Sequence, residues 1–227
     1  MQRIAFFGGT FDPPHRGHLA VAKAAADHFA LEKVLFAPVA TQPLKDHSTP
    51  TPFLHRYAMT ALATQADPRF TPSLLDAPLL DGPQLDAPSR PNYTVETLER
   101  LRATLPASTA LFTLVGADSW LQIAQWHDAP RLLALSDWIV AARPGFSLDS
   151  APRALPPEVS VEQQQTTLLL RHKNAPPTQV FFLLHTHEEI SATELRVSLE
   201  SGHLDPNLLP TAVQQYIQKT GLYRREG

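Results

Sequence analysis

A short segment near the N-terminus, GGTFDPPHRGHL, combines residue types that bind phosphate. Gly8 and Gly9 would let the backbone turn tightly and come close to a ligand, and Thr10 offers a hydroxyl and a backbone N–H. His15 and His18 lie one turn apart at the predicted start of a helix, whose N-terminal end favours anions. Imidazole N–H groups at that position can donate to phosphate oxygens, so the segment predicts a local phosphate-binding site.

Two other interpretations of this segment stay open. The glycines could belong to an ordinary loop between strand and helix, with both histidines on the surface. The histidine pair could also bind a metal ion, although no convincing third ligand is evident. Two better-known phosphate motifs are excluded, because the chain has no G-x-x-x-x-G-K-[ST] and no G-x-G-x-x-G after the first apolar run.

The composition limits the classes of function. Nineteen Lys and Arg against 22 Asp and Glu give a net charge of −3, which argues against a nucleic-acid binder or an anionic-membrane binder. The chain has no cysteine, hence no disulfide, thiolate zinc site or catalytic thiol, as suits a reducing cytoplasm. No apolar run approaches the ~18 residues of a membrane span, and the first run is too short for a signal peptide. We expect a soluble cytoplasmic protein.

Short apolar runs alternate with helix-patterned stretches, which predicts an α/β fold with a parallel sheet covered on both faces. In such sheets ligands bind beyond the carboxyl ends of the strands, near the switch in strand order. The glycine-rich segment begins at the carboxyl end of the first predicted strand. Strands are expected at 3–7, 33–38, 110–116, 137–142 and 180–184, and helices at 19–29, 94–105, 192–199 and 210–217.

Two proline-rich stretches, around 67–91 and 144–179, are interpreted as elaborate connections within one domain that spans residues 1–227. The second stretch contains VSVEQQQTTLLLRH, which is compatible with a strand or short helix of its own.

Several segments together resemble a known family. GGTFDPPHRGHL resembles the G-[GS]-[TS]-F-D-P-x-H-x-G-H segment of the HxGH nucleotidyltransferases, and its GGTFDPPH form is similar to that of bacterial nicotinate-nucleotide adenylyltransferases. The resemblance continues in the family's order through nearly the whole chain, in APVATQPLKD, NYTVETL, LVGADSWLQIAQW, ARPG, ISATELR and LPTAVQQYIQKTGLY. The sequence departs from the family pattern in three places. It has TQPLK in the proline-rich loop that ends in lysine, Asn92 in place of the usual serine, and His185 and His187 where Thr-Pro is common. His185 and His187 could together bind zinc, but an ordinary strand end is the preferred interpretation.

The resemblance implies a Rossmann-like fold of the nucleotidyltransferase type and transfer of AMP from ATP to nicotinate mononucleotide, which gives deamido-NAD and pyrophosphate in NAD biosynthesis. Because the nucleophile is the substrate's own phosphate, the reaction needs no protein nucleophile. Catalysis would be positioning and charge stabilisation, with Mg²⁺ carried mainly by the ATP phosphates and no metal site built by the protein alone.

The resemblance also implies roles for individual residues. His18 and Thr10 would meet the α-phosphate, His15 would bridge triphosphate oxygens, and Arg196 would reach the β- and γ-phosphates. The expected ATP site comprises Gly8, Gly9, Thr10, His15, His18, Lys45, Asp118, Ser191, Thr193 and Arg196.

For the acceptor, Trp126 would stack on the pyridine ring, and Thr94, next to Tyr93, would hold its carboxylate together with backbone amides. Plain structural interpretations stay open: core packing for Trp126, a helix N-cap for Asp118, caps for Ser191 and Thr193, and a solvated charge for Arg196. Arg143 in ARPG is a weaker candidate for a nucleotide contact.

Other functions also stay open. A related HxGH enzyme could use nicotinamide mononucleotide or phosphopantetheine as acceptor, and a nucleotide-sensing module could keep the fold without turnover. Such a module would be free to lose His18, Lys45 or Arg196, and all three are present. The expected partners are therefore ATP and nicotinate mononucleotide, without nucleic acid or membrane, and a homo-oligomer is left open.

Overall fold

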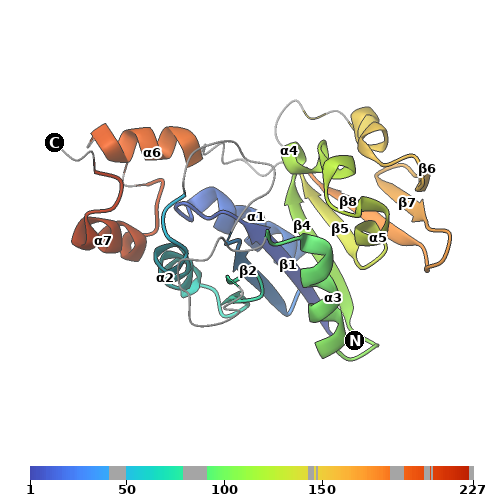
Figure 1. Cartoon of the computed structure of the whole chain (residues 1–227), viewed down its shortest axis with the longest axis horizontal. Coiled ribbons are helices and arrows are strands. Elements are labelled where there is room, and N and C mark those ends of the chain that lie inside the picture. The colour runs from blue at the N-terminus through green and yellow to red at the C-terminus, as the bar shows by residue number, and fades with distance from the viewer. Residues whose placement is uncertain are drawn as a thin grey trace.

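The computed structural model describes residues 1–40, 50–78, 91–142, 146, 148–184, 192–201, 205 and 207–224. Its centre is a twisted sheet with helices on both faces (Figure 1). The strands lie in the order β3-β2-β1-β4-β5-β8-β7-β6. Their bounds are β1 Arg3–Gly9, β2 Lys33–Pro38, β3 Phe70–Pro72, β4 Ala110–Gly116, β5 Asp137–Ala141, β6 Ser160–Gln163, β7 Thr167–Arg171 and β8 Thr178–Leu183.

Helices connect most of these strands. The α-helices are α1 Arg16–His28, α2 Phe53–Thr64, α3 Thr94–Thr104, α4 Ala117–Trp120, α5 Ala129–Leu133, α6 Ala192–Ser201 and α7 Thr211–Thr220. Three 3₁₀ turns, η1 Ile123–Gln125, η2 Leu148–Ser150 and η3 Pro152–Ala154, lie in the connections. None of the helices in the described part of the chain is long and apolar enough to cross a membrane.

Alternating side chains of the strands supply two cores, one on each face of the sheet. Phe6 of β1 faces one core, where it joins residues of α3, α4 and α5 such as Leu98. Phe7, the next residue, faces the other core. There α1 contributes Ala22 and Ala25, whose small side chains let the helix lie close to the strands.

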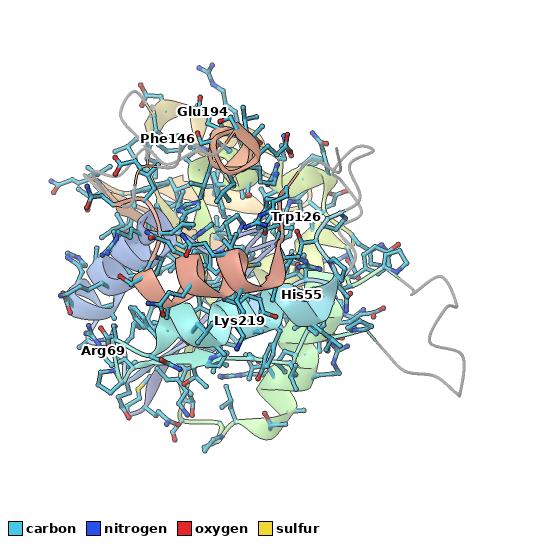
Figure 2. The ribbon with its side chains drawn as sticks, turned by 90° about the vertical axis from the view of Figure 1, so that its left-hand side faces the viewer. His55, Arg69, Trp126, Phe146, Glu194 and Lys219 are labelled. Atoms are coloured by element: carbon cyan, nitrogen blue, oxygen red, sulfur yellow. The ribbon has the colours of Figure 1, made fainter. Side chains whose placement is uncertain are left out.

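A third core lies at one end of the molecule. Met59 and Ala63 of α2 pack there against Leu195 of α6 and Val213 of α7. Figure 2 looks onto this end and shows α7 in front of α2, with α6 seen end-on above them near the label of Glu194. Leu19 of α1 packs against both this core and the one beneath α1, so the two are continuous.

The chain reverses its strand order between β1 and β4. It runs from β1 outward through β2 to β3, and then returns to place β4 on the other side of β1. These strands are parallel, with Phe6 opposite Thr113, so the carboxyl ends of β1 and β4 meet at one edge. This is the switch point at which α/β sheets bind ligands.

The α/β fold with its mostly parallel sheet is confirmed, and the structure adds elements that the sequence did not predict. Within the proline-rich stretches, residues 70–72 form the edge strand β3, and the VSVEQQQTTLLLRH segment forms an antiparallel hairpin of β6 and β7 that extends the sheet beyond β8. The sheet is therefore mixed rather than wholly parallel. Helix α2 was also not predicted.

Candidate active site

Gly8 and Gly9 do not form the tight turn that their residue type suggested. Both belong to β1, which runs two residues beyond its predicted end at Phe7. Glycine fits these positions because a larger residue would be too close to a phenylalanine ring. A Cβ at Gly8 would lie 2.9 Å from Cε1 of Phe6, and one at Gly9 would lie 3.2 Å from Cζ of Phe11. The chain changes direction at Phe11, whose φ of +48° lies in the left-handed region.

The two histidines form a reciprocal cap at the start of α1. His15 is the N-cap, and its Nδ1 accepts the backbone N–H of His18 at 3.4 Å, while Nδ1 of His18 accepts the backbone N–H of His15 at 3.2 Å. Because each Nδ1 accepts a hydrogen bond, the hydrogen-bond pattern assigns the ring hydrogen of both neutral imidazoles to Nε2.

The rings of His15 and His18 stack with centroids 3.6 Å apart, and the ring of Phe11 packs edge-on against His18 at 5.0 Å. His15 is only 5% exposed. The capping bonds and ring contacts therefore fix the orientation of both imidazoles at the N-terminal end of a helix, where the backbone also favours negative charge.

The backbone of Thr10 is hydrogen-bonded to a buried arginine, Arg56. The carbonyl oxygen of Thr10 accepts from Nη1 of Arg56 on α2 at 2.8 Å. The same guanidinium donates to the carbonyl oxygens of Val39, Ala40 and Thr51 at 2.7, 3.3 and 2.7 Å, and Arg56 is 1% exposed. Burial lowers the pKa of Arg56 from its ordinary value, and the four carbonyls satisfy donors that water cannot reach. Arg56 thus joins the end of β1 to the end of β2.

Asp12 connects the C-terminal part of the chain to GGTFDPPHRGHL, residues 8–19, which we call the histidine segment. Its carbonyl oxygen accepts from Nη1 of Arg196 on α6 at 2.9 Å, and Nη2 of Arg196 donates to Oγ1 of Thr193 at 3.2 Å. Arg196 is half-buried, and these two bonds hold its guanidinium beside Asp12. Thr193 is the second residue of α6 rather than its N-cap.

A second buried acidic residue joins the start of α3 to the segment after β2. Asp76 is 3% exposed and accepts a short hydrogen bond from the hydroxyl of Thr97. Its backbone oxygen accepts from the N–H of Ala40 at 3.0 Å, and Oδ2 would lie 3.9 Å from a Cβ on Gly8. Burial raises the pKa of Asp76 to about 6, against the opposing effects of the Thr97 hydrogen bond and of Arg100.

The expected acceptor residues meet between α3 and the segment after β4. Tyr93 is the N-cap of α3 and Thr94 its first residue. The ring of Tyr93 stacks on His127 with centroids 4.0 Å apart. Trp126, the residue before His127, is half-buried against the core. The structure thus brings Tyr93 and Thr94 to the Trp126 segment.

Asp118 is exposed in the short helix α4, which follows β4 directly. Gly116 is the N-cap of this helix, so the N-cap interpretation of Asp118 was wrong. Other expectations lie outside the described residues: Lys45, Arg143, His185, His187 and Ser191.

Sequence reasoning gave no role to four residues that organise this site: Asp12, Arg56, Asp76 and Tyr223. Asp12 stands inside the histidine segment, so its position was a usable signal. The others lie in helix α2, in a proline-rich stretch and near the C-terminus, and nothing in their local sequence shows that they are partly or fully buried.

Comparisons with known proteins identify relatives along the full chain. The model of the cytidylyltransferase-like family matches residues 6–198. A probable nicotinate-nucleotide adenylyltransferase of Acidothermus cellulolyticus is 37% identical over 98% of this chain and 95% of its own. Those of Syntrophotalea carbinolica and Thermus thermophilus are 35% and 36% identical, over 99% and 98% of this chain and 98% and 100% of their own.

Solved structures agree in fold. The nicotinic acid mononucleotide adenylyltransferase of Plasmodium falciparum, complexed with NaAD, superposes with a TM-score of 0.68 over 98% of each chain, at 17% identity. Its complex with APC superposes with a TM-score of 0.67. The relationship that the sequence motifs indicated is confirmed: the chain belongs to the cytidylyltransferase-like family and, within it, to the nicotinate-nucleotide adenylyltransferases.

Proposed function

We propose that this chain transfers AMP from ATP to nicotinate mononucleotide, which produces nicotinate adenine dinucleotide and pyrophosphate in NAD biosynthesis. The observation that carries the proposal is the stacked pair of His15 and His18, which caps the N-terminus of α1 beside the β1–β4 switch point and whose Nε2–H groups would donate to phosphate. Full-length relatives at 35–37% identity support the choice of reaction.

In this reaction the phosphate of the acceptor attacks the α-phosphorus of ATP. A new P–O bond forms as the bond between the α-phosphorus and its bridging oxygen breaks, and pyrophosphate leaves with that oxygen. The attacking phosphate is already an anion, so no side chain has to remove a proton from a hydroxyl. His18 Nε2–H and Thr10 would donate to the α-phosphate oxygens as negative charge develops, and His15 would donate beside them.

At the leaving end, Arg196 and Thr193 would hold the β- and γ-phosphates. Their mutual hydrogen bond and the contact of Arg196 with Asp12 support this role, because they hold the guanidinium beside the histidine segment. Lys45 and Ser191 complete the expected triphosphate contacts on sequence grounds, and the backbone of Gly8 and Gly9 would approach the nucleotide.

For the acceptor, Trp126 would stack on the pyridine ring, with Tyr93 alongside. Thr94 and backbone amides at the start of α3 would bind the nicotinate carboxylate in charge-assisted hydrogen bonds, which the neutral amide of nicotinamide cannot reproduce. Asp118 would bind ribose hydroxyls or waters of a nucleotide-bound metal ion.

Mg²⁺ fits this site as a companion of the nucleotide. Triphosphate oxygens and water are its ordinary ligands, and the exposed carboxylate of Asp118 is of the right type for its water shell. When bound, the ion would neutralise charge on the phosphates. We also propose a cytoplasmic location, where ATP and the acceptor are available.

One experiment tests the function and its alternatives. The purified chain is incubated with ATP, MgCl₂ and, separately, nicotinate mononucleotide, nicotinamide mononucleotide and phosphopantetheine, and products are identified by mass. We expect nicotinate adenine dinucleotide and pyrophosphate, with kcat/KM much higher for the acid than for the amide. Equal kcat/KM for the two mononucleotides would contradict the carboxylate pocket. A product only with phosphopantetheine, or ATP binding without any product, would support the related enzyme or the sensing module.

A further inference from the structure

The C-terminal end of the described chain folds back onto the histidine segment. Helix α7 ends at Thr220 with Gly221 as its C-cap, and both Gly221 and Tyr223 have left-handed backbone, with φ of +70° and +61°. The hydroxyl of Tyr223 donates a hydrogen bond to Oδ1 of Asp12, in the segment between β1 and α1. Residues 211 positions apart in the sequence are thereby joined.

Asp12 is the point at which several segments meet. Asp12 is 5% exposed, and its Oδ2 accepts the backbone N–H of Thr51 at 3.0 Å. Its carbonyl oxygen accepts from Arg196. Asp12 lies between Thr10 and His15, so any displacement of Asp12 moves a phosphate-binding residue on each side.

The hydroxyl of Tyr223 is a dependable donor. Burial, followed by the nearby Asp12 carboxylate and their hydrogen bond, raises the pKa of Tyr223 above its ordinary value. The phenol therefore keeps its proton throughout the neutral range. A protonated phenol and a carboxylate form a charge-assisted hydrogen bond, which is stronger than one between neutral groups.

We propose that Tyr223 is a positioning residue for adenylyl transfer, which acts through Asp12 to hold Thr10, the histidine pair and Arg196 in one arrangement around the triphosphate. The proposal rests on the proposed function. It does not place Tyr223 in contact with substrate. The turn at the end of α7 thereby contributes to ATP binding and turnover, although its Tyr223 is 211 positions from Asp12 in the sequence.

Tyr216 supplies a matched control. It lies on α7, and its hydroxyl is hydrogen-bonded to Nδ1 of His55 on α2 at 2.8 Å. Both tyrosines therefore fasten the same C-terminal segment through one hydroxyl, but only Tyr223 is bonded to the histidine segment. Replacing either with phenylalanine removes one oxygen and keeps the ring in the third core.

The experiment compares Tyr223→Phe, Tyr216→Phe and the wild type in steady-state kinetics, with ATP and nicotinate mononucleotide varied separately. For Tyr223→Phe we expect KM for ATP to rise and kcat to fall, each about tenfold, because small misplacements of phosphate-binding groups are costly. KM for the acceptor should stay within about twofold. Both substitutions should lower the thermal unfolding midpoint by similar amounts. Tyr216→Phe should leave kcat, KM for ATP and KM for the acceptor near their wild-type values.

A double variant of Tyr223 and Asp12 distinguishes a positioning role of Tyr223 from a general loss of stability. If Tyr223 acts through Asp12, the double variant Asp12→Asn, Tyr223→Phe should be little worse than Asp12→Asn alone. Wild-type kinetics for Tyr223→Phe, equal kinetic losses in both tyrosine variants, or multiplying losses in the double variant would each overturn the proposal. Calorimetric binding of ATP alone gives a readout without turnover, so the comparison stands even if the proposed acceptor proves wrong.

Discussion

Each imidazole of the histidine pair uses its Nδ1 to cap helix α1, and in the proposed function its Nε2–H donates to phosphate. The spacing of three between His15 and His18 predicted that they share a face, and the capping bonds explain why this spacing orients both rings. The sequence could not reveal that Arg56 and Asp76 join the segments around this site. Their contacts are with residues distant in the chain, which no local pattern records.

Substitution of His18 separates its two roles. His18→Ala removes both the Nε2–H donor and the Nδ1 acceptor of the cap, so we expect kcat to fall by roughly 10²–10³ and stability to fall by about 1 kcal/mol. His18→Asn keeps an acceptor near the position of Nδ1 and should recover stability without recovering kcat. Steady-state kinetics and chemical denaturation check both values. A variant with near wild-type turnover would remove His18 from the chemistry.

The buried carboxyl of Asp76 should make stability depend on pH. Burial raises its pKa from 3.8 to about 6, so between these values the folded state binds the proton more tightly than the unfolded state. This group's contribution to stability is therefore fully present below pH 3.8 and is lost as the pH rises through 6. The difference, 6 − 3.8 = 2.2, corresponds to about 3 kcal/mol.

The measurement is the free energy of unfolding of wild type and Asp76→Asn at several pH values from about 4 to about 7. The side-chain amide of the variant cannot ionise, so the stability of the variant relative to wild type should increase by roughly 2–2.5 kcal/mol across this range, most of the full difference. Curves that run parallel would show that Asp76 titrates as an ordinary exposed carboxyl.

At the scale of elements, predictability followed the apolar pattern. Helices α1, α3, α6 and α7 were predicted to within a few residues because their apolar side chains recur at helical spacing. Helix α2 was not, because its buried face includes Arg56, Thr60 and Thr64 beside Met59 and Ala63. A face in which buried positions are polar carries little helical signal. Strand β3 has only three residues and includes a proline, so it too was hidden.

Helix α6 should contribute to ATP binding through the geometry of one guanidinium. Arg196 already spans Asp12 and Thr193 through separate nitrogens, and a lysine offers one compact ammonium that cannot do the same. We expect Arg196→Lys to raise KM for ATP and lower kcat, while KM for the acceptor changes little. Kinetics with both substrates varied provide the check, and unchanged ATP constants would remove α6 from the triphosphate site.

At the scale of the molecule, the order of the motifs along the chain and their place at one edge of a parallel sheet could be predicted. The antiparallel extension by β6 and β7 could not, because short strands in a proline-rich stretch lack a clear pattern. Nor could the third core, which packs α2 against α6 and α7 from distant parts of the sequence. That core places the C-terminal segment where Tyr223 and Arg196 reach Asp12.

The continuity of the cores predicts how the whole chain responds to ATP. Leu19 packs against two of the three cores, and Arg196 and Tyr223 join the third core, through Asp12, to the segment between β1 and α1. We therefore expect one cooperative thermal transition. ATP with Mg²⁺ at about 100 times its Kd adds about 2.7 kcal/mol, which shifts the midpoint of a chain of this size by roughly 5–11 °C. Differential scanning calorimetry at several ATP concentrations tests this. Two transitions, of which ATP moves only one, would show instead that α2, α6 and α7 unfold as a separate unit and would contradict the single domain inferred from the sequence.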